Sequence, residues 1–533
     1  MTHGFNARPR VLALAIETAS PCFIDAGCRE GIFPVLQSLR ARGIWGTLHS
    51  VTNISSGSVW PSMYTGCNPA KHGMANFHMH LVKGTYHIDR YGPDQVKRAP
   101  FWDYLGQQGL RSVIVDVPLT RPRPNHEGVL ISAWGVEGPA WIRESHPPDL
   151  LRRILKDIGP YALPNDDYRR SIRPSTREQY RELRGLLLAG IRQKTQLLRY
   201  LMKQEQWNLF LAVYSESHWA VHVMYQTLDP RHPDHRPELA DEFQRFYREL
   251  FQAQDEAIGE LLEHAPDEIS VLVFSASGFR PNYTANHLLP EVLNRLGVGS
   301  APSTSIAEDE DAHSYSYYRI RRIQDTVSTP LIMAAKRVVP RRIWEKWTRR
   351  LLFARENWAR SKAFCLPNDY CGSVRINLRG REPNGLVSPE EYDGLCDELE
   401  RAFLQLKNAA TGAPAVEEVL RVRRECSGEH VDALPDLSIV WSDAHPFEGI
   451  QSDQIGVVRG VNPERRPGAH HAEGFYALAG PTIEHRAGPE TAHLVDLAPT
   501  VIDLLGAKAP DGLDGSIIRA CEAGVQRVPP AGL

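Results

Sequence analysis

Short, continuous apolar segments recur along the first half of the chain, and each is followed by a longer segment with helical periodicity. The clearest are VLALAI, RSVIVDVP, WNLFLAVYS and ISVLVFSAS, and charged or turn-forming residues bound each of them. Continuous apolar runs of this length are typical of strands that are buried on both faces. The pattern therefore predicts an α/β fold with a mainly parallel sheet that is flanked by helices.

The polar residues that follow these four segments are the first candidates for function. Glu17, Asp116, Ser215–His218 and Ser275–Gly278 each come where an apolar segment ends. In open parallel sheets, binding residues collect beyond the carboxyl ends of the strands. We therefore expect several of these positions to lie close together.

The pattern changes after about residue 297, which predicts an inserted α+β cap region. Residues 336–362 are rich in Lys, Arg and Trp, and we interpret them as an amphipathic helix with a solvated basic face. Contact of this face with an anionic ligand or a membrane surface is the alternative. Further on, SPEEYDGLCDELERAFLQL predicts a helix that Ser388 caps, with Glu391 three residues later.

The last part of the chain is expected to return to the first unit. GFYALAGP has the pattern of a strand, and VDLAPTVIDLLG has that of a helix that begins near Pro499. We predict the first part of the α/β core in residues 1–296, the inserted cap in residues 297–437, and the completion of the core in residues 438–533.

Composition narrows the class of protein. A chain of 533 residues with 42% hydrophobic and 23% charged residues is typical of a soluble globular enzyme. The net charge of −3 gives no overall attraction to nucleic acid, so any anion-binding site is expected to be local. Eight scattered cysteines without a CxxC pair, and an N-terminal apolar run too short for a signal peptide or a membrane span, predict a cytoplasmic protein. The oligomeric state is left open.

Histidines give the first indication of a metal site. His218 and His222 in ESHWAVH are four residues apart, so on a helix they share one face and could bind one metal ion. The spacing alone is weak evidence in a chain with 21 histidines. A third imidazole could come from His470 or His471 in GAHHAEG. Three neutral imidazoles and an open position form a catalytic zinc arrangement.

Serines give the first indication of a nucleophile. Ser55, Ser56 and Ser58 lie in SVTNISSGSVWPSMYTGCNPAKHG, just before a predicted helix. A hydroxyl at a helix N-terminus is well placed to attack a phosphorus or sulfur centre, while backbone N–H groups bind the anion. The same residues also cap helices without any chemical role. Lys71 and His72 are expected to add local positive charge.

Together these motifs resemble the alkaline phosphatase superfamily, in particular its type I phosphodiesterase and nucleotide pyrophosphatase branch. The resemblance covers most of the chain and rests on the TG-x-NPA-x-HG block and on the HxxEG…GP…DLAPT series. It implies that superfamily's fold. It also implies two metal ions, usually zinc, beside a Thr or Ser nucleophile.

Aligned with the family motifs, five residues acquire expected roles. Ser56 stands at the nucleophile position. Glu17 stands where the family has an Asp metal ligand, and we expect it to act as a general base toward Ser56. His222 and His470 match histidine ligands. His218 stands where the family usually has Asp, and a histidine there can still bind zinc.

Ala276 and Ser277 depart from the family pattern. The family has Ser-Asp-His-Gly at this strand end, which supplies two ligands to one metal ion, whereas this chain has Ser-Ala-Ser-Gly. Alanine has no ligand atom, and a neutral hydroxyl is a poor substitute for imidazole. The resemblance therefore implies a single zinc ion on His218, His222 and His470.

The expected function follows from these residues. It is hydrolysis of a small anionic substrate, a phosphodiester, phosphomonoester or related ester. A transferase or lyase-like biosynthetic enzyme on the same scaffold, and a non-catalytic binding protein, are the alternatives.

Overall fold

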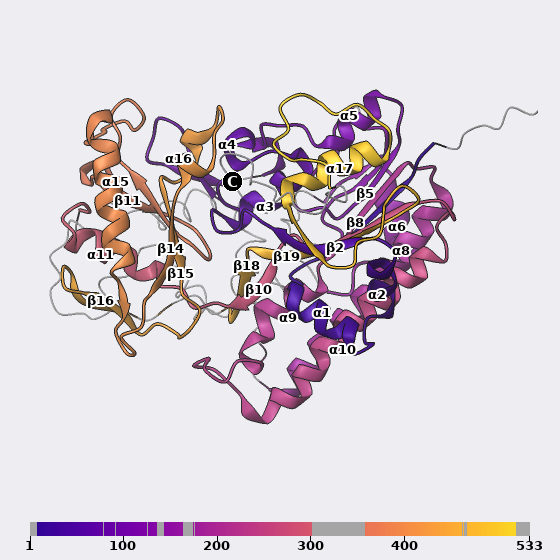
Figure 1. Cartoon of the computed structure of the whole chain (residues 1–533), viewed down its shortest axis with the longest axis horizontal. Coiled ribbons are helices and arrows are strands. Elements are labelled where there is room, and N and C mark those ends of the chain that lie inside the picture. Colours follow the sequence, from indigo (N-terminus) through magenta and orange to yellow (C-terminus); the bar gives the residue numbers. More distant parts are fainter. Residues whose placement is uncertain are drawn as a thin grey trace, which may run out of the picture.

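The computed structural model describes residues 8–518, apart from residues 78, 91, 125, 136–142, 164–173, 175, 301–357, 461 and 463–465. Within this part, the chain forms two lobes, one built on a large sheet and one on smaller antiparallel sheets (Figure 1). Most of the predicted basic helix of residues 336–362 lies outside the described residues.

The large sheet confirms the predicted α/β fold. Its described strands, from one edge to the other, are β20 (Pro489–His493), β2 (Ile44–His49), β19 (Glu473–Ala479), β9 (Ser270–Phe274), β1 (Val11–Ile16), β8 (Leu209–Tyr214), β5 (Ser112–Val115), β6 (Gly128–Ile131) and β7 (Ser145–His146). Strands β9, β1, β8, β5 and β6 pair in parallel. Only β19 and β7, of these nine, run antiparallel to their neighbours.

Helices cover both faces of this sheet (Figure 1). One layer consists of α1 (Pro21–Arg29), α2 (Pro34–Ala41), α6 (Leu150–Asp157), α8 (Arg177–Gln204), α9 (Glu216–Met224) and α10 (Pro237–Leu262). The opposite layer includes α3 (Ser56–Thr65), α5 (Phe101–Gln107) and α17 (Leu497–Leu504). Alternate residues of β1 pack against the two layers, which is why its sequence is apolar without interruption. None of the described helices has the length and apolar composition needed to cross a membrane.

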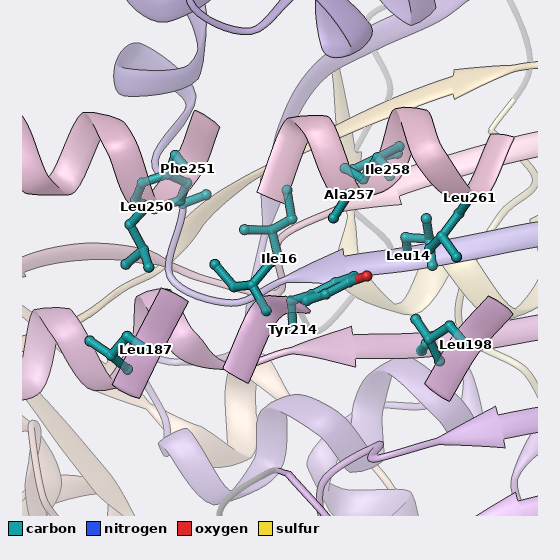
Figure 2. Close-up of a cluster of buried hydrophobic side chains, with 14 of the residues drawn as sticks. Leu14, Ile16, Leu187, Leu198, Tyr214, Leu250, Phe251, Ala257, Ile258 and Leu261 are labelled. Atoms are coloured by element: carbon teal, nitrogen blue, oxygen red, sulfur yellow. The ribbon is translucent and has the colours of Figure 1, made fainter. Parts of the chain in front are cut away.

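The core beneath the site is packed where β1 and β8 end. Ile16 and Tyr214, the last residues of these strands, lie between the apolar faces of α8 and α10 (Figure 2). Both side chains are almost fully buried. Burial of one large apolar side chain contributes about 1.5–3 kcal/mol. The two strand ends that carry Glu17 and the start of α9 are therefore firmly positioned.

The smaller lobe is an α+β unit. Its four-stranded antiparallel sheet has the order β11 (Ala363–Leu366), β12 (Gly372–Ile376), β15 (Leu437–Trp441) and β14 (Val416–Arg421). Helices α11 (Leu289–Arg295) and α15 (Pro389–Leu404) contribute to the same apolar core. The predicted capping box is confirmed, because Ser388 caps α15 and Glu391 bonds back to its backbone N–H.

Shorter elements complete the described structure. They are a three-stranded sheet of β13 (Lys407–Asn408), β16 (Gly449–Ser452) and β17 (Gly456–Arg459), the strand pairs β3 (Met79–Leu81) with β4 (Ile88–Arg90) and β10 (Gly278–Pro281) with β18 (Gly468–His471), helices α4 (Pro69–His72) and α16 (Val422–Glu425), and 3-10 turns at Pro93–Gln95, Tyr225–Thr227, Asn286–Leu288, Trp358–Arg360, Val431–Ala433 and Leu494–Asp496. The predicted cap limits at residues 297 and 437 stay a prediction. The strand pairs place β15, β16 and β17 in the sheets of the smaller lobe.

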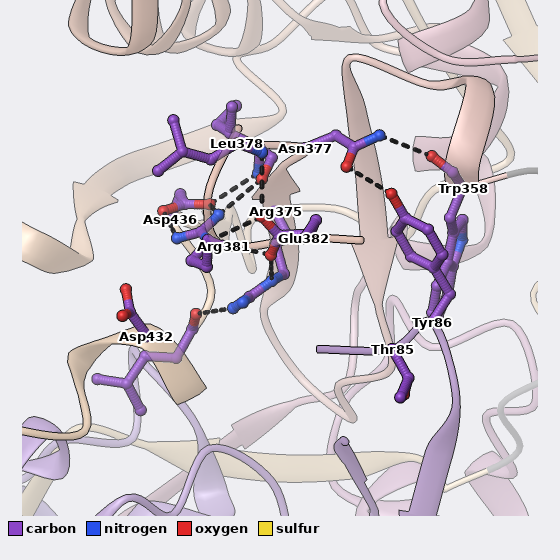
Figure 3. A network of polar contacts seen from close by, with 12 residues as sticks. Thr85, Tyr86, Trp358, Arg375, Asn377, Leu378, Arg381, Glu382, Asp432 and Asp436 are labelled. Atoms are coloured by element: carbon purple, nitrogen blue, oxygen red, sulfur yellow. Dashed lines mark hydrogen bonds and ion pairs between the residues drawn. The ribbon is translucent and has the colours of Figure 1, made fainter. Parts of the chain in front are cut away.

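A buried network of charges holds the smaller lobe together (Figure 3). Arg381 binds both carboxylate oxygens of Asp436, at 2.8 and 2.6 Å, and Arg375 binds Glu382 at 2.6 Å. Burial would raise the pKa of the Asp436 carboxyl, but Arg381 and Arg375 lower it to about 2. Its stabilising effect is therefore complete above the unfolded pKa of about 4 and is lost as the pH falls toward 2.

We predict that Asp436→Asn lowers the free energy of unfolding by about 3–5 kcal/mol, because it leaves the two buried guanidinium groups of Arg375 and Arg381 with only one carboxylate, that of Glu382. Asp432→Asn is the matched control, since Asp432 pairs with Arg423 but its side chain is 49% exposed, against 1% for Asp436. The control should lose no more than about 1 kcal/mol. Urea unfolding at neutral pH measures both, and equal losses would contradict the prediction.

Candidate active site

A pocket with about 610 Å³ of empty space lies where β1, β8 and β9 end. Three of the four predicted strand-end positions contribute to it, together with the start of α3, β18 and the smaller lobe. The lining includes the five residues to which the family motifs assign roles, Glu17, Ser56, His218, His222 and His470. It also includes Trp60, Phe77, Pro118, Ala276, Ser277, Asp369, Tyr370 and Arg466.

Three histidines converge in this pocket. His218 and His222 are one turn apart on α9, and their ring centres lie 4.3 Å from each other. The ring centre of His470, on β18, lies 5.0 Å from the ring centre of each of them. One nitrogen from each ring can be chosen so that all three lie within 4.8 Å of one another, which makes a group able to hold a metal ion. His471 points elsewhere, and its Nδ1 accepts the backbone N–H of Glu473.

Hydrogen bonds orient two of the rings. His222 Nδ1 donates to the carbonyl oxygen of Gly468 at 2.8 Å, so its Nε2 is free of hydrogen. His470 Nδ1 lies 3.0 Å from Ser277 Oγ. Metal-binding histidines typically use one nitrogen for such a partner and the other for the ion. Burial, reinforced by the neighbouring histidines, lowers the pKa of His222 well below its ordinary value, which favours the neutral, metal-binding form.

Close packing at Gly468 brings the strand and the helix together. Strand β18 pairs with β10, with His470 opposite Phe279. A Cβ atom at residue 468 would lie 2.3 Å from the carbonyl oxygen of Val221 on α9. Only glycine allows this approach, and the approach places His470 beside the α9 histidines.

The structure separates the three serines at the start of α3. Ser55 is the N-cap, and its Oγ accepts the N–H of Gly57 at 3.2 Å. Ser58 is fully buried and donates to the carbonyl oxygen of Met74 at 2.6 Å. Ser56, the first residue of the helix, is half-buried and lines the pocket. Of the three, it is therefore the hydroxyl available to a bound molecule.

Glu17 lies between the start of α3 and the histidines. The indole N–H of Trp60 donates to its Oε1 at 3.0 Å, and its Oε2 lies 3.9 Å from His218 Nδ1. Ser217 Oγ donates to the Glu17 carbonyl oxygen at 2.5 Å, which links β1 to α9. The carboxylate thus lines the same pocket as the hydroxyl of Ser56.

The expected positive charge of Lys71 and His72 does not reach the pocket. His72 is fully buried against Ser62, and burial lowers its pKa to about 3, so the ring is neutral. Lys71 forms an ion pair with Asp514. Asp514 also accepts the backbone N–H of Asn68 at 2.8 Å. The NPA-x-HG block therefore anchors the C-terminal segment instead of binding an anion.

Asp116, the fourth strand-end position, also serves another purpose. It is completely buried, pairs with Lys194 of α8, and accepts the backbone N–H groups of Trp134 and Gly135 at 2.7 and 2.8 Å. Its carboxylate is used by this internal network and does not line the pocket.

Residues from outside the predicted motifs complete the pocket. Tyr370 of the smaller lobe stacks on His222 with an interplanar angle of 10°. Arg466 lies 5.4 Å from the Tyr370 ring centre, and its Nη2 is 3.1 Å from Asp369 Oδ1. No local sequence pattern links the NDY segment to the histidine motifs, because the contact depends on how the two lobes pack.

Comparison with known sequences decides the family. The chain matches the family described as type I phosphodiesterase / nucleotide pyrophosphatase over residues 11–445. It belongs to this family. The chain is thus grouped with phosphodiesterase and pyrophosphatase hydrolases of the alkaline phosphatase superfamily, which act on phosphoryl esters. None of the curated proteins matches it in sequence.

Solved structures align with most of this chain at low sequence identity. Phosphonoacetate hydrolase from Sinorhizobium meliloti 1021, in complexes with phosphonoformate and phosphonoacetate, is 12% identical, with a TM-score of 0.49 over 93% of this chain and 96% of that chain. An inactive variant of murine ectonucleotide pyrophosphatase / phosphodiesterase 5, in complex with AMP, is 10% identical, with a TM-score of 0.45 over 95% and 97%.

We predict that Gly468→Ala lowers the free energy of unfolding by about 1–3 kcal/mol, because the new methyl group overpacks the contact between β18 and α9. Gly488→Ala is the control, since a Cβ there would meet no atom within 4 Å. The control should change stability by about 0.5 kcal/mol at most. Urea unfolding compares the two, and a Gly468 variant as stable as the control would show that the packing is less tight.

Proposed function

We propose that this protein is a metal-dependent hydrolase that cleaves a small phosphoryl ester, with Ser56 as the nucleophile and one bound metal ion. The observation that carries the proposal is the convergence of three imidazoles in the same pocket as Ser56. A metal site and a hydroxyl at a helix N-terminus are the two parts that phosphoryl transfer through a covalent intermediate requires.

Zinc is the proposed metal. His218, His222 and His470 would hold it, because neutral imidazole nitrogens suit Zn²⁺ and because partners at Gly468 and Ser277 already orient two of the rings. When bound, Zn²⁺ supplies a Lewis acid that polarises the substrate or stabilises the leaving oxygen. A second ion is not part of the proposal, since Ala276 has no ligand atom and Ser277 faces His470.

The chain's own residues carry the proposed reaction. Ser56 Oγ attacks phosphorus, a new O–P bond forms, and the P–O bond to the leaving group breaks. Glu17 takes the Ser56 proton, directly or through a water molecule. The leaving oxygen takes a proton from water and leaves as an alcohol. A water molecule then attacks the phosphorus of the phosphoserine ester, the Ser56 Oγ–P bond breaks, Oγ regains a proton, and the phosphoryl product is released.

The surroundings of Ser56 favour an anionic substrate. The first backbone N–H groups of α3 and the helix dipole stabilise negative charge beside this residue. Arg466 adds a guanidinium to the pocket wall, although Asp369 shares its charge. Phosphate monoesters and diesters are therefore the substrates to try first, with sulfate esters as a test of charge selectivity.

We predict that the purified protein binds about one equivalent of zinc. The double variant His218→Ala/His222→Ala should lose it, because two of three nitrogen ligands are gone. His471→Ala is the matched control and should retain the metal, since His471 lies outside the histidine cluster. Elemental analysis of protein prepared without a chelator measures the content. Two equivalents, or none, would contradict the single-metal proposal.

Ser56→Ala should lower kcat/KM on the best ester by about 10³-fold or more, equivalent to about 4 kcal/mol of transition-state stabilisation. Ser56→Thr should retain activity, because it keeps a hydroxyl at the same position. Bound zinc should stay unchanged in both variants. If the zinc-loaded protein hydrolyses none of the phosphate and sulfate esters, the transferase or binding-protein alternative is favoured instead.

A further inference from the structure

The described ligand set of the histidine cluster contains no oxygen or sulfur ligand. Among the described residues, the His, Cys, Asp and Glu side chains whose ligand atoms converge here are the three histidines alone. A catalytic zinc ion commonly has three protein ligands and a fourth position for water or substrate. The chemical identity of the group at that fourth position therefore matters for the reaction.

Tyr370 brings a phenol oxygen to the cluster. It lies in the loop between β11 and β12 of the smaller lobe, and only 2% of the residue is exposed. Its hydroxyl oxygen is 3.1 Å from His222 Nε2. Because Nδ1 of this neutral ring donates to Gly468, the phenol O–H is the donor to Nε2. Nε2 is the nitrogen that a metal ion would use.

The separation of these two atoms suits two ligands of one ion. Two tetrahedral ligand atoms about 2.0–2.1 Å from zinc lie about 3.3 Å apart. The observed 3.1 Å is close to this value. An ion bound to both atoms would lie off the line that joins them, and the phenol would release its proton to solvent.

Tyr370 is held in this position from several sides. Its ring stacks on His222, and its backbone N–H donates to Asn368 Oδ1 at 3.3 Å. Asn368 Nδ2 in turn donates to the carbonyl oxygen of Ile54 at 3.2 Å, two residues before Ser56. The thiol of Cys371 lies 3.6 Å from the Thr52 carbonyl oxygen. The loop of the smaller lobe is thus joined to the segment just before the proposed nucleophile.

We propose that Tyr370 is a fourth protein ligand of the metal ion held by His218, His222 and His470. This inference rests on the proposed function, since it concerns the same metal site. The smaller lobe then completes the metal centre, in addition to lining the pocket. A substrate oxygen would reach the ion either as a fifth ligand or by displacing the phenol oxygen.

The test is metal titration of the metal-free protein and its Tyr370→Phe variant. Phe keeps the ring that stacks on His222 and removes only the hydroxyl. With Cu²⁺ as the probe, the wild type should show a phenolate-to-copper charge-transfer band, and Tyr370→Phe should lack it. With Co²⁺ in competition with a chelator, Tyr370→Phe should bind about 10-fold more weakly or worse.

Tyr283→Phe is the matched control. Its hydroxyl is also buried and bonds to Asp229 Oδ2 at 3.0 Å, outside the cluster of His218, His222 and His470. This variant should keep both the copper band and the Co²⁺ affinity of the wild type. The comparison separates loss of a ligand from loss of any buried hydroxyl.

The outcomes distinguish the two proposals. If the wild type binds copper without the band, or if Tyr370→Phe binds Co²⁺ as tightly as the wild type or more tightly, Tyr370 is not a ligand and the single-metal hydrolase stands. If the wild type binds neither ion, the metal site itself is wrong and both proposals fail. The band is read on the wild type, so the test holds even if the variant folds poorly.

Discussion

The close contact between Gly468 and α9 is the constraint on which the rest of the site depends. It brings β18 against the helix, so that His470 meets His218 and His222, and it supplies the carbonyl oxygen that orients His222. A side chain at residue 468 would separate the two elements. The pairing of β10 with β18 also contributes, because it brings the segment that follows β9 toward His470. Backbone packing therefore decides where the imidazoles lie.

The large sheet provides the rigid base for this contact. Strands β1, β8 and β9 are parallel neighbours, and the segments that follow them supply Glu17, the α9 histidines and Ser277. Their ends are held between apolar helical layers, so the ligand positions do not depend on long, exposed loops. The smaller lobe adds Asp369 and Tyr370 from a loop that is hydrogen-bonded to the segment before Ser56. The pocket is therefore a joint product of the two lobes.

The departure from the family pattern at the end of β9 acquires a physical meaning in this setting. Ala276 and Ser277 stand where the family has two metal ligands. Ser277 still takes part in the site, because its Oγ contacts His470 Nδ1. In the proposed single-metal site, this position orients a ligand instead of supplying one. The positive charge expected near Ser56 does not reach the pocket either, since Lys71 pairs with Asp514 and burial keeps His72 neutral.

The sequence by itself determined the local elements and the family. Uninterrupted apolar runs predicted the buried strands, the Ser388 box predicted α15, and the HxxxH spacing put two histidines on one helical face, because each depends on periodicity or on neighbouring backbone groups. The family motifs already favoured Ser56 and His470, and the structure adds a physical reason, because these two residues line the pocket whereas Ser55, Ser58 and His471 do not. Only the tertiary structure brought in Tyr370 and Arg466. These outcomes depend on contacts between segments far apart in the chain, and no local pattern records them. Local motifs therefore predict part of the site, and the packing of distant segments determines the rest.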